Sequence, residues 1–182
     1  GFSEIVPEYL NKLPINFYDD LDTKPSVHQL WMEMMIKHSR PGIINPEDEL
    51  LWLMQLNYYL HLHILNDLCL EKILISLEQN DLWKNTIIIF TSDHGDQCGS
   101  HKLRSKGPWN YQETMKVPMC IVSPEYNGPR ETHNLTSHID LAPTIFSFAK
   151  SSKKFDYKFQ GNNLIDLLED QSAAVSDYVY FA

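Results

Sequence analysis

The sequence has little positive charge and few cysteines. Fifteen lysines and arginines stand against 24 aspartates and glutamates, which gives a formal net charge of −9 over 182 residues. This balance argues against nucleic acid or an anionic membrane as the main partner. It does not exclude an anionic substrate. Salt screens charges that are more than about 8–10 Å away, so a cation within the site can outweigh the net negative charge of the chain. The three cysteines lack metal-type spacing and fit a reducing, cytoplasmic compartment better than a disulfide framework.

The chain also lacks repeats, low-complexity tracts and a long uninterrupted apolar run. Its longest helical pattern, over residues 48–80, is interrupted by His61, His63, Asp67 and Glu71. These polar residues exclude a membrane span there. A chain of 182 residues is long enough to bury a core, so we expect one domain or part of one.

What is present is an alternation of helical and strand patterns. Residues 1–46 are rich in proline, asparagine and aspartate and predict an extended, linker-like segment, and residues 47–182 predict an α/β part. The expected helices cover residues 27–38, 48–80 and about 140–150, and the expected strands cover residues 86–91, 117–123 and 178–182. This order is typical of a layered α/β domain.

The strand predicted at residues 86–91 ends in Ser-Asp-His-Gly-Asp, and these residues form the strongest candidate site. The strand is β-branched and aromatic, which favours an interior parallel strand, and ligands collect at the carboxyl ends of such strands. We expect Gly95 to allow a sharp turn, so that Asp93 and His94 converge on one metal ion. Lys106 adds a positive charge thirteen residues after Asp93. Metal ligands followed by a lysine indicate a site for an anionic oxoester.

Each of these residues has a simpler interpretation. Asp93 and His94 could form an ordinary turn with a solvated histidine, and Lys106 could be a surface lysine. His101 either contacts substrate or packs the loop. Asp96 either supports a ligand or caps the turn.

Residues on both sides of this motif extend it in a consistent order. They are Leu13-Pro14, Asn16-Phe17, Asp19-Asp20-Leu21 and Lys24-Pro25 before it, and Gly99-Ser100-His101, Lys106-Gly107-Pro108, Tyr111, Glu113, Val117-Pro118, Asp140-Leu141-Ala142-Pro143-Thr144 and Gln160-Gly161 after it. With these residues the sequence resembles the sulfatase family of the alkaline phosphatase superfamily. The branch it resembles contains choline-sulfatase-like and phosphonate-monoester-hydrolase-like enzymes. The resemblance covers about Pro7 to Phe181.

The resemblance implies an alkaline-phosphatase-like three-layer α/β/α sandwich, present as a partial domain. It implies that Asp93 and His94 bind a divalent metal ion, which would be calcium, or magnesium or manganese. Lys106 would be catalytic and would bind substrate together with His101. The substrate would be a sulfate ester of a small molecule or saccharide. The alternatives are a phosphodiester or phosphonate monoester hydrolase on the same scaffold, or a catalytically inactive module.

One family feature is missing from the sequence. Sulfatases carry their nucleophile in a Cys-x-Pro-Ser-Arg motif, whose cysteine or serine becomes formylglycine, and they carry two further metal-binding aspartates near the start of the domain. None of Cys69, Cys98 and Cys120 is followed by Pro-Ser-Arg. We therefore expect the chain to be the C-terminal portion of a sulfatase catalytic domain, inactive alone and completed by the N-terminal part of the same enzyme.

Overall fold

The computed structural model describes residues 7–38, 45–126, 128–149, 158–170 and 172–179. The chain forms two compact units, residues 1–121 and residues 122–182. Every predicted site residue belongs to the first unit. In the described part of the chain, no helix combines the length and apolar character needed to cross a membrane.

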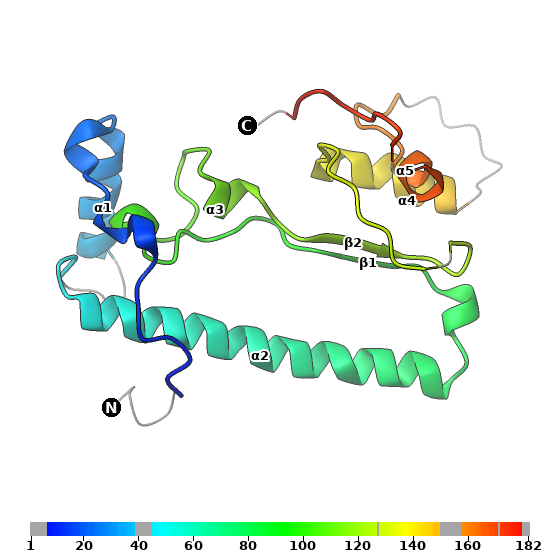
Figure 1. The fold of residues 1–182 in the computed structure, drawn as a ribbon, viewed down its shortest axis with the longest axis horizontal. Helices are drawn as coiled ribbons and strands as arrows, with labels where there is room; N and C mark the ends of the chain where they lie inside the picture. Colours follow the sequence, from blue (N-terminus) through cyan, green and yellow to red (C-terminus); the bar gives the residue numbers. More distant parts are fainter. Residues whose placement is uncertain (1–6, 39–44, 127, 150–157, 171, 180–182) are drawn as a thin grey trace. The chain divides into compact units, whose positions relative to one another are not determined.

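Two helices of the first unit confirm the sequence prediction. Helix α1 covers Val27–His38 and helix α2 covers Glu49–Gln79 (Figure 1). Asp48 caps the first turn of α2, since its side chain accepts a hydrogen bond from the Leu51 N–H at 3.3 Å. The buried Asn57 attaches the amino-terminal segment to α2, because its Oδ1 accepts hydrogen bonds from two successive backbone N–H groups of that segment.

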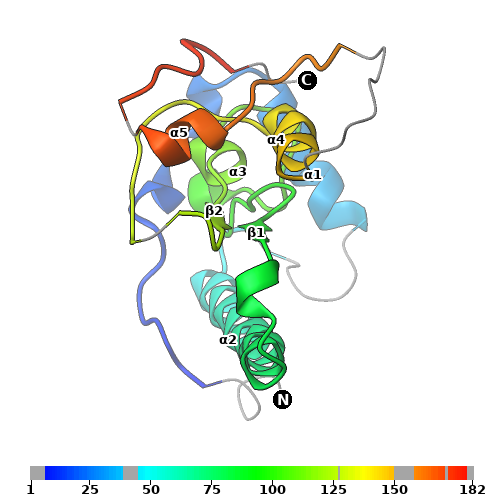
Figure 2. The ribbon, with the colours of Figure 1, turned by 90° about the vertical axis from the view of Figure 1, so that its right-hand side faces the viewer.

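The two described strands are short and pair with each other. Strand β1 covers Ile88–Thr91 and strand β2 covers Met119–Val122. The chain runs along β1 away from the end of α2 and returns along β2 in the opposite direction (Figures 1 and 2). The predicted parallel neighbour of β1 is therefore not among the described residues. Phe90 is 48% exposed, so the described residues do not bury β1 as the sequence predicts.

Short elements build the core of the first unit. They are the 3-10 turns η2 (Ile15–Tyr18), η3 (Leu21–Thr23), η4 (Trp83–Asn85) and η5 (Ser100–Lys102), and helix α3 (Gln112–Met115). Phe17 packs edge-on against Trp52 of α2. Leu21, Leu103 and Trp109 form a second buried cluster. The segment predicted to be linker-like therefore contributes Phe17 and Leu21 to the core.

The second unit contains η6 (His138–Asp140), α4 (Leu141–Phe148) and α5 (Ile165–Glu169). Helix α4 confirms the helix predicted at residues 140–150. The buried Asp140 carboxylate accepts hydrogen bonds from the Ser137 and Asn162 N–H groups, each at 2.7 Å. Of the strand predicted at residues 178–182, residues 178 and 179 are not in a strand, and residues 180–182 lie outside the described part.

Candidate active site

The candidate site begins where β1 ends. Thr91 is the last strand residue, and Ser92 to Asp96 form a turn held by short-range hydrogen bonds. The Ser92 hydroxyl donates to the His94 carbonyl at 2.9 Å, and the His94 N–H donates to Asp93 Oδ1 at 2.9 Å. These bonds fix the direction in which the Asp93 and His94 side chains leave the backbone.

Asp93 and His94 come together as the sequence predicts. Asp93 Oδ2 lies 3.5 Å from His94 Nε2. His94 Nδ1 lies 2.8 Å from the Gly95 carbonyl oxygen, to which it can donate only as an N–H. Nε2 then carries a lone pair facing the carboxylate. A metal-binding histidine usually donates its other ring N–H in this way, because the bond fixes the tautomer and the ring orientation.

The distance between the two groups fits shared ligation. Ligand atoms lie about 2.0–2.6 Å from a divalent ion, so two ligands of one ion are separated by roughly 3–4 Å. The backbone N–H of His94 lowers the pKa of the Asp93 carboxyl, and the Ser92 hydroxyl lowers it further. The carboxylate is therefore ionised at neutral pH. Within the described ranges, no three histidine, cysteine, aspartate or glutamate side chains are grouped to hold a metal.

Gly95 is required for a reason other than the predicted one. Its backbone has no positive φ, so the turn does not depend on a left-handed glycine. Instead, a Cβ at this position would lie 1.9 Å from the Glu113 carbonyl oxygen. The Gly95 N–H donates to the Thr114 carbonyl at 2.9 Å, so the turn of residues 92–96 lies directly against the backbone of α3. Gly95 thus permits a close approach of two chain segments.

Lys106 is exposed at the end of an irregular loop. It follows Ser105, whose φ is 64°, and precedes Gly107, whose φ is 63°. Among the described residues, no carboxylate forms an ion pair with Lys106. Its ammonium is therefore available to an anion. That Lys106 shares one bound anion with an ion held by Asp93 and His94 stays a prediction.

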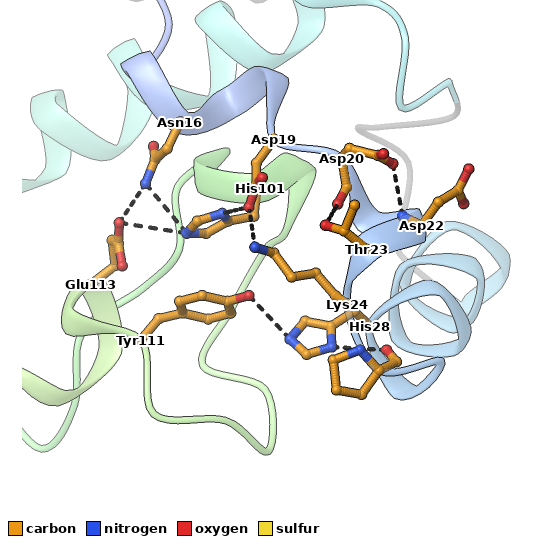
Figure 3. Close-up of polar contacts among 11 residues, drawn as sticks. Asn16, Asp19, Asp20, Asp22, Thr23, Lys24, His28, His101, Tyr111 and Glu113 are labelled. Carbon is orange, nitrogen blue, oxygen red and sulfur yellow. Dashed lines mark hydrogen bonds and ion pairs between the residues drawn. The ribbon is translucent and has the colours of Figure 1, made fainter.

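His101 lies in a separate polar cluster, shown in Figure 3. Its Nδ1 lies 2.7 Å from Asp19 Oδ2, and its Nε2 lies 3.3 Å from Asn16 Nδ2 and 4.0 Å from Glu113 Oε1. The ring stacks on Tyr111 at a centroid distance of 4.2 Å. Only 12% of the side chain is exposed. These contacts favour the loop-packing role, and the predicted substrate contact of His101 stays a prediction.

Asp19 is the centre of this cluster. The Lys24 ammonium lies 3.0 Å from Asp19 Oδ2. Lys24 and then His101 lower the pKa of the Asp19 carboxyl, and Asp19 in turn raises the pKa of Lys24. Sequence reasoning assigned no role to Asp19 or Asn16. Their shared partner His101 is more than 80 residues away in the sequence, and no spacing pattern reports such a contact.

Comparison with known proteins identifies the family. A family model described as Sulfatase matches residues 6–151. The chain therefore belongs to the sulfatase family. The curated sulfatase YidJ of Escherichia coli strain K12, named as uncharacterized, is 32% identical over 177 residues, which is 92% of this chain and 33% of the relative. The multifunctional alkaline phosphatase superfamily protein PehA of Trinickia caryophylli is 34% identical over 84 residues, 45% of this chain and 16% of the relative.

Solved structures confirm the fold. A 2-O GAG sulfatase matches with a TM-score of 0.73 and 21% identity over 95% of this chain and 39% of its own. A protein solved in complex with its substrate D-glucosamine-2-N,6-O-disulfate matches with a TM-score of 0.68 and 20% identity over 94% of this chain and 44% of its own. The chain thus has part of the alkaline-phosphatase-like α/β fold, and it spans less than half the length of these proteins.

Proposed function

We propose that this chain supplies the metal-binding turn and the substrate-binding lysine of a sulfatase that hydrolyses a sulfate ester of a small molecule or saccharide. The main support is the turn after β1, where Asp93 Oδ2 and His94 Nε2 face each other at 3.5 Å. The separation suits two ligands of one ion, and the other His94 nitrogen already has a partner. Membership of the sulfatase family gives the class of reaction.

Asp93 and His94 fit a divalent ion, which the sulfatase family uses together with formylglycine. Their side chains would hold calcium, or magnesium or manganese, with further carboxylates outside residues 1–182. When bound, such an ion supplies Lewis acidity at the sulfate oxygens. One imidazole in the ligand set does not decide the metal, since calcium prefers all-oxygen ligands and other ions accept nitrogen. The lowered pKa of Asp93 keeps its carboxylate ready for a cation.

Lys106 is the proposed substrate-binding and catalytic residue. Its exposed ammonium would bind a sulfate oxygen and neutralise the negative charge that develops as the S–O bond breaks. The formylglycine nucleophile would come from a part of the protein outside residues 1–182. His101 is a second proposed substrate contact, although both of its ring nitrogens already have protein partners.

A phosphodiester or phosphonate monoester is the second candidate substrate. The similarity to PehA, a multifunctional member of the alkaline phosphatase superfamily, supports a second substrate class, and the choline-sulfatase or phosphonate-monoester-hydrolase branch stays part of the proposal. A third candidate is a catalytically inactive module. The presence or absence of Cys-x-Pro-Ser-Arg in the remainder of the protein distinguishes the inactive module from the two enzymes.

The proposed function is tested in the full-length protein that contains this chain. We expect hydrolysis of an aryl sulfate to exceed hydrolysis of the matching phosphodiester and phosphonate. Asp93→Ala should remove both activity and bound metal, measured by elemental analysis. Asp67→Ala, which changes an exposed aspartate on α2, should alter neither. Full-length Asp93→Ala protein that keeps its metal and its rate would refute the site.

Residues 1–182 alone are expected to show no turnover of aryl sulfates or phosphodiesters. Catalytic groups that act as a unit have strongly non-additive effects, so part of a site does not retain a proportional share of the rate. The measurement is a chromogenic sulfate assay on the purified chain. Hydrolysis that persists after removal of contaminating sulfatases would show that the chemistry lies elsewhere in these residues.

A further inference from the structure

The loop that carries Lys106 has an unusual backbone. Of the five described non-glycine residues with positive φ, four lie between residues 98 and 105. They are Cys98, His101, Lys102 and Ser105, with φ values of 48°, 57°, 52° and 64°. Side chains disfavour this left-handed region, so the surrounding structure must hold the loop in place.

One carboxylate joins the two ends of this strained stretch. Asp96 Oδ1 accepts a hydrogen bond from the Cys98 N–H at 2.9 Å and from the Ser105 N–H at 3.2 Å. The donors are the first and the last of the four strained residues. The Gln97 N–H also donates to the Ser105 carbonyl at 3.1 Å. Asp96 therefore closes a loop whose next residue is Lys106.

Other contacts attach the closed loop to the first unit. Leu103 is 1% exposed in the cluster with Leu21 and Trp109. His101 bonds to Asp19, and the Lys102 ammonium lies 2.7 Å from Glu47 Oε2. Three anchors inside the loop thus fix its body, while Asp96 fixes its two ends.

We propose that Asp96 is the positioning residue that sets the location of Lys106 relative to the metal-binding turn. Asp96 is three residues after Asp93 on the same turn, and through Ser105 it fixes the residue directly before Lys106. The carboxylate acts on the backbone and does not contact substrate. This inference rests on the proposed function, because it assigns to Lys106 its role at the sulfate.

The carboxylate can be tested with matched substitutions in the full-length protein. Asp96→Ala removes the acceptor, whereas Asp96→Asn keeps an oxygen at the same position. Asp170→Ala is the control, since Asp170 Oδ1 accepts a backbone N–H two residues later, from Ser172 at 2.9 Å, but belongs to the other unit. We expect Asp96→Ala to lower kcat/KM about 10–100-fold, as loss of an indirect support to a site typically does. Asp96→Asn and Asp170→Ala should stay within about threefold of the unmodified protein.

A double-substitution cycle separates positioning from general stability. If Asp96 acts through Lys106, Asp96→Ala should cost little in a protein that already carries Lys106→Ala. If the two losses multiply instead, Asp96 does not act through Lys106 and the proposal is wrong.

Amide hydrogen exchange gives a readout that does not depend on activity. In Asp96→Ala, the Cys98 and Ser105 N–H groups should exchange at least about tenfold faster, because their acceptor is gone. Unchanged exchange at both amides would overturn the proposal whatever the kinetics. A full-length protein without sulfatase activity would instead reject the proposed function, and the exchange rates would still decide whether Asp96 fixes the loop.

Discussion

The loop from Ser92 to Glu113 and helix α2 differ in what covers their side chains. In the loop, Leu103 and Gln97 are each 1% exposed and Trp109 is 7% exposed. In α2, only Trp52 and Asn57 are buried among the described residues. Eight large apolar or aromatic side chains of α2 are exposed, namely Leu50, Tyr58, Leu62, Ile64, Leu65, Leu68, Ile73 and Ile75.

The difference shows two ways in which the conformation of a segment is stabilised. The loop has few regular hydrogen bonds, yet partners from distant parts of the same unit fix its shape. Helix α2 forms its own backbone hydrogen bonds, and apolar residues occur all round it, a pattern typical of a buried helix. The described residues therefore bury the core side chains of the loop but leave many apolar side chains of α2 exposed.

The largest expected difference concerns two leucines. Leu103→Ala should lower the free energy of unfolding by about 2–5 kcal/mol, because it leaves a cavity between Leu21 and Trp109. Leu68→Ala should cost well under about 1 kcal/mol, because Leu68 is 49% exposed. Urea unfolding of the chain measures both. Equal losses would show that α2 is packed as tightly as the loop.

The second prediction compares two lysines in the full-length protein. Lys106→Ala should lower kcat/KM on an aryl sulfate by about 100-fold or more, as removal of one transition-state donor does, and should leave the metal content unchanged. Lys72→Ala, on the exposed surface of α2, should leave both unchanged. A loss of metal with Lys106→Ala would assign Lys106 to the metal site instead.

The same contrast explains what could be predicted from the sequence. Helix α2 and strands β1 and β2 follow local patterns of apolar residues and end signals such as Asp48, so their approximate bounds were predictable. The Asp93–His94 pair was predictable because adjacent residues at a strand end share one short turn. The partners of His101 were not, since Asn16 and Asp19 reach it from the amino-terminal segment. The role of Gly95 was not predictable either, because it depends on the close approach of the Glu113 carbonyl oxygen.

The third prediction concerns pH and the cluster around Asp19. Because the folded pKa of Asp19 is lowered by Lys24 and His101, its stabilisation is complete above its unfolded pKa of about 3.9 and is lost as the pH falls through the folded pKa. Asp19→Asn should therefore lower Tm by about 2–4 °C at pH 7, and this difference should shrink below about pH 4. Thermal unfolding across pH 3–8 measures it.

Two controls sharpen this test. Asp67→Asn on α2, where the side chain is exposed, should give the same Tm as the unmodified chain at each pH. A loss from Asp19→Asn that stays constant down to pH 3 would show that the effect arises from packing and not from the charge of Asp19.

The smallest expected effect comes from two glutamines with unpaired polar atoms. Neither Gln97 Oε1 nor Nε2 has a hydrogen-bond partner among the described residues, and Gln97 is 1% exposed. Gln97→Met keeps the size of the side chain and removes the buried polar groups, so it should raise the free energy of unfolding by up to about 1 kcal/mol. Gln55→Met on α2 should change it by less than about 0.5 kcal/mol, since Gln55 is only half-buried. Destabilisation by Gln97→Met would show that Gln97 has a polar partner, such as a buried water, in the loop.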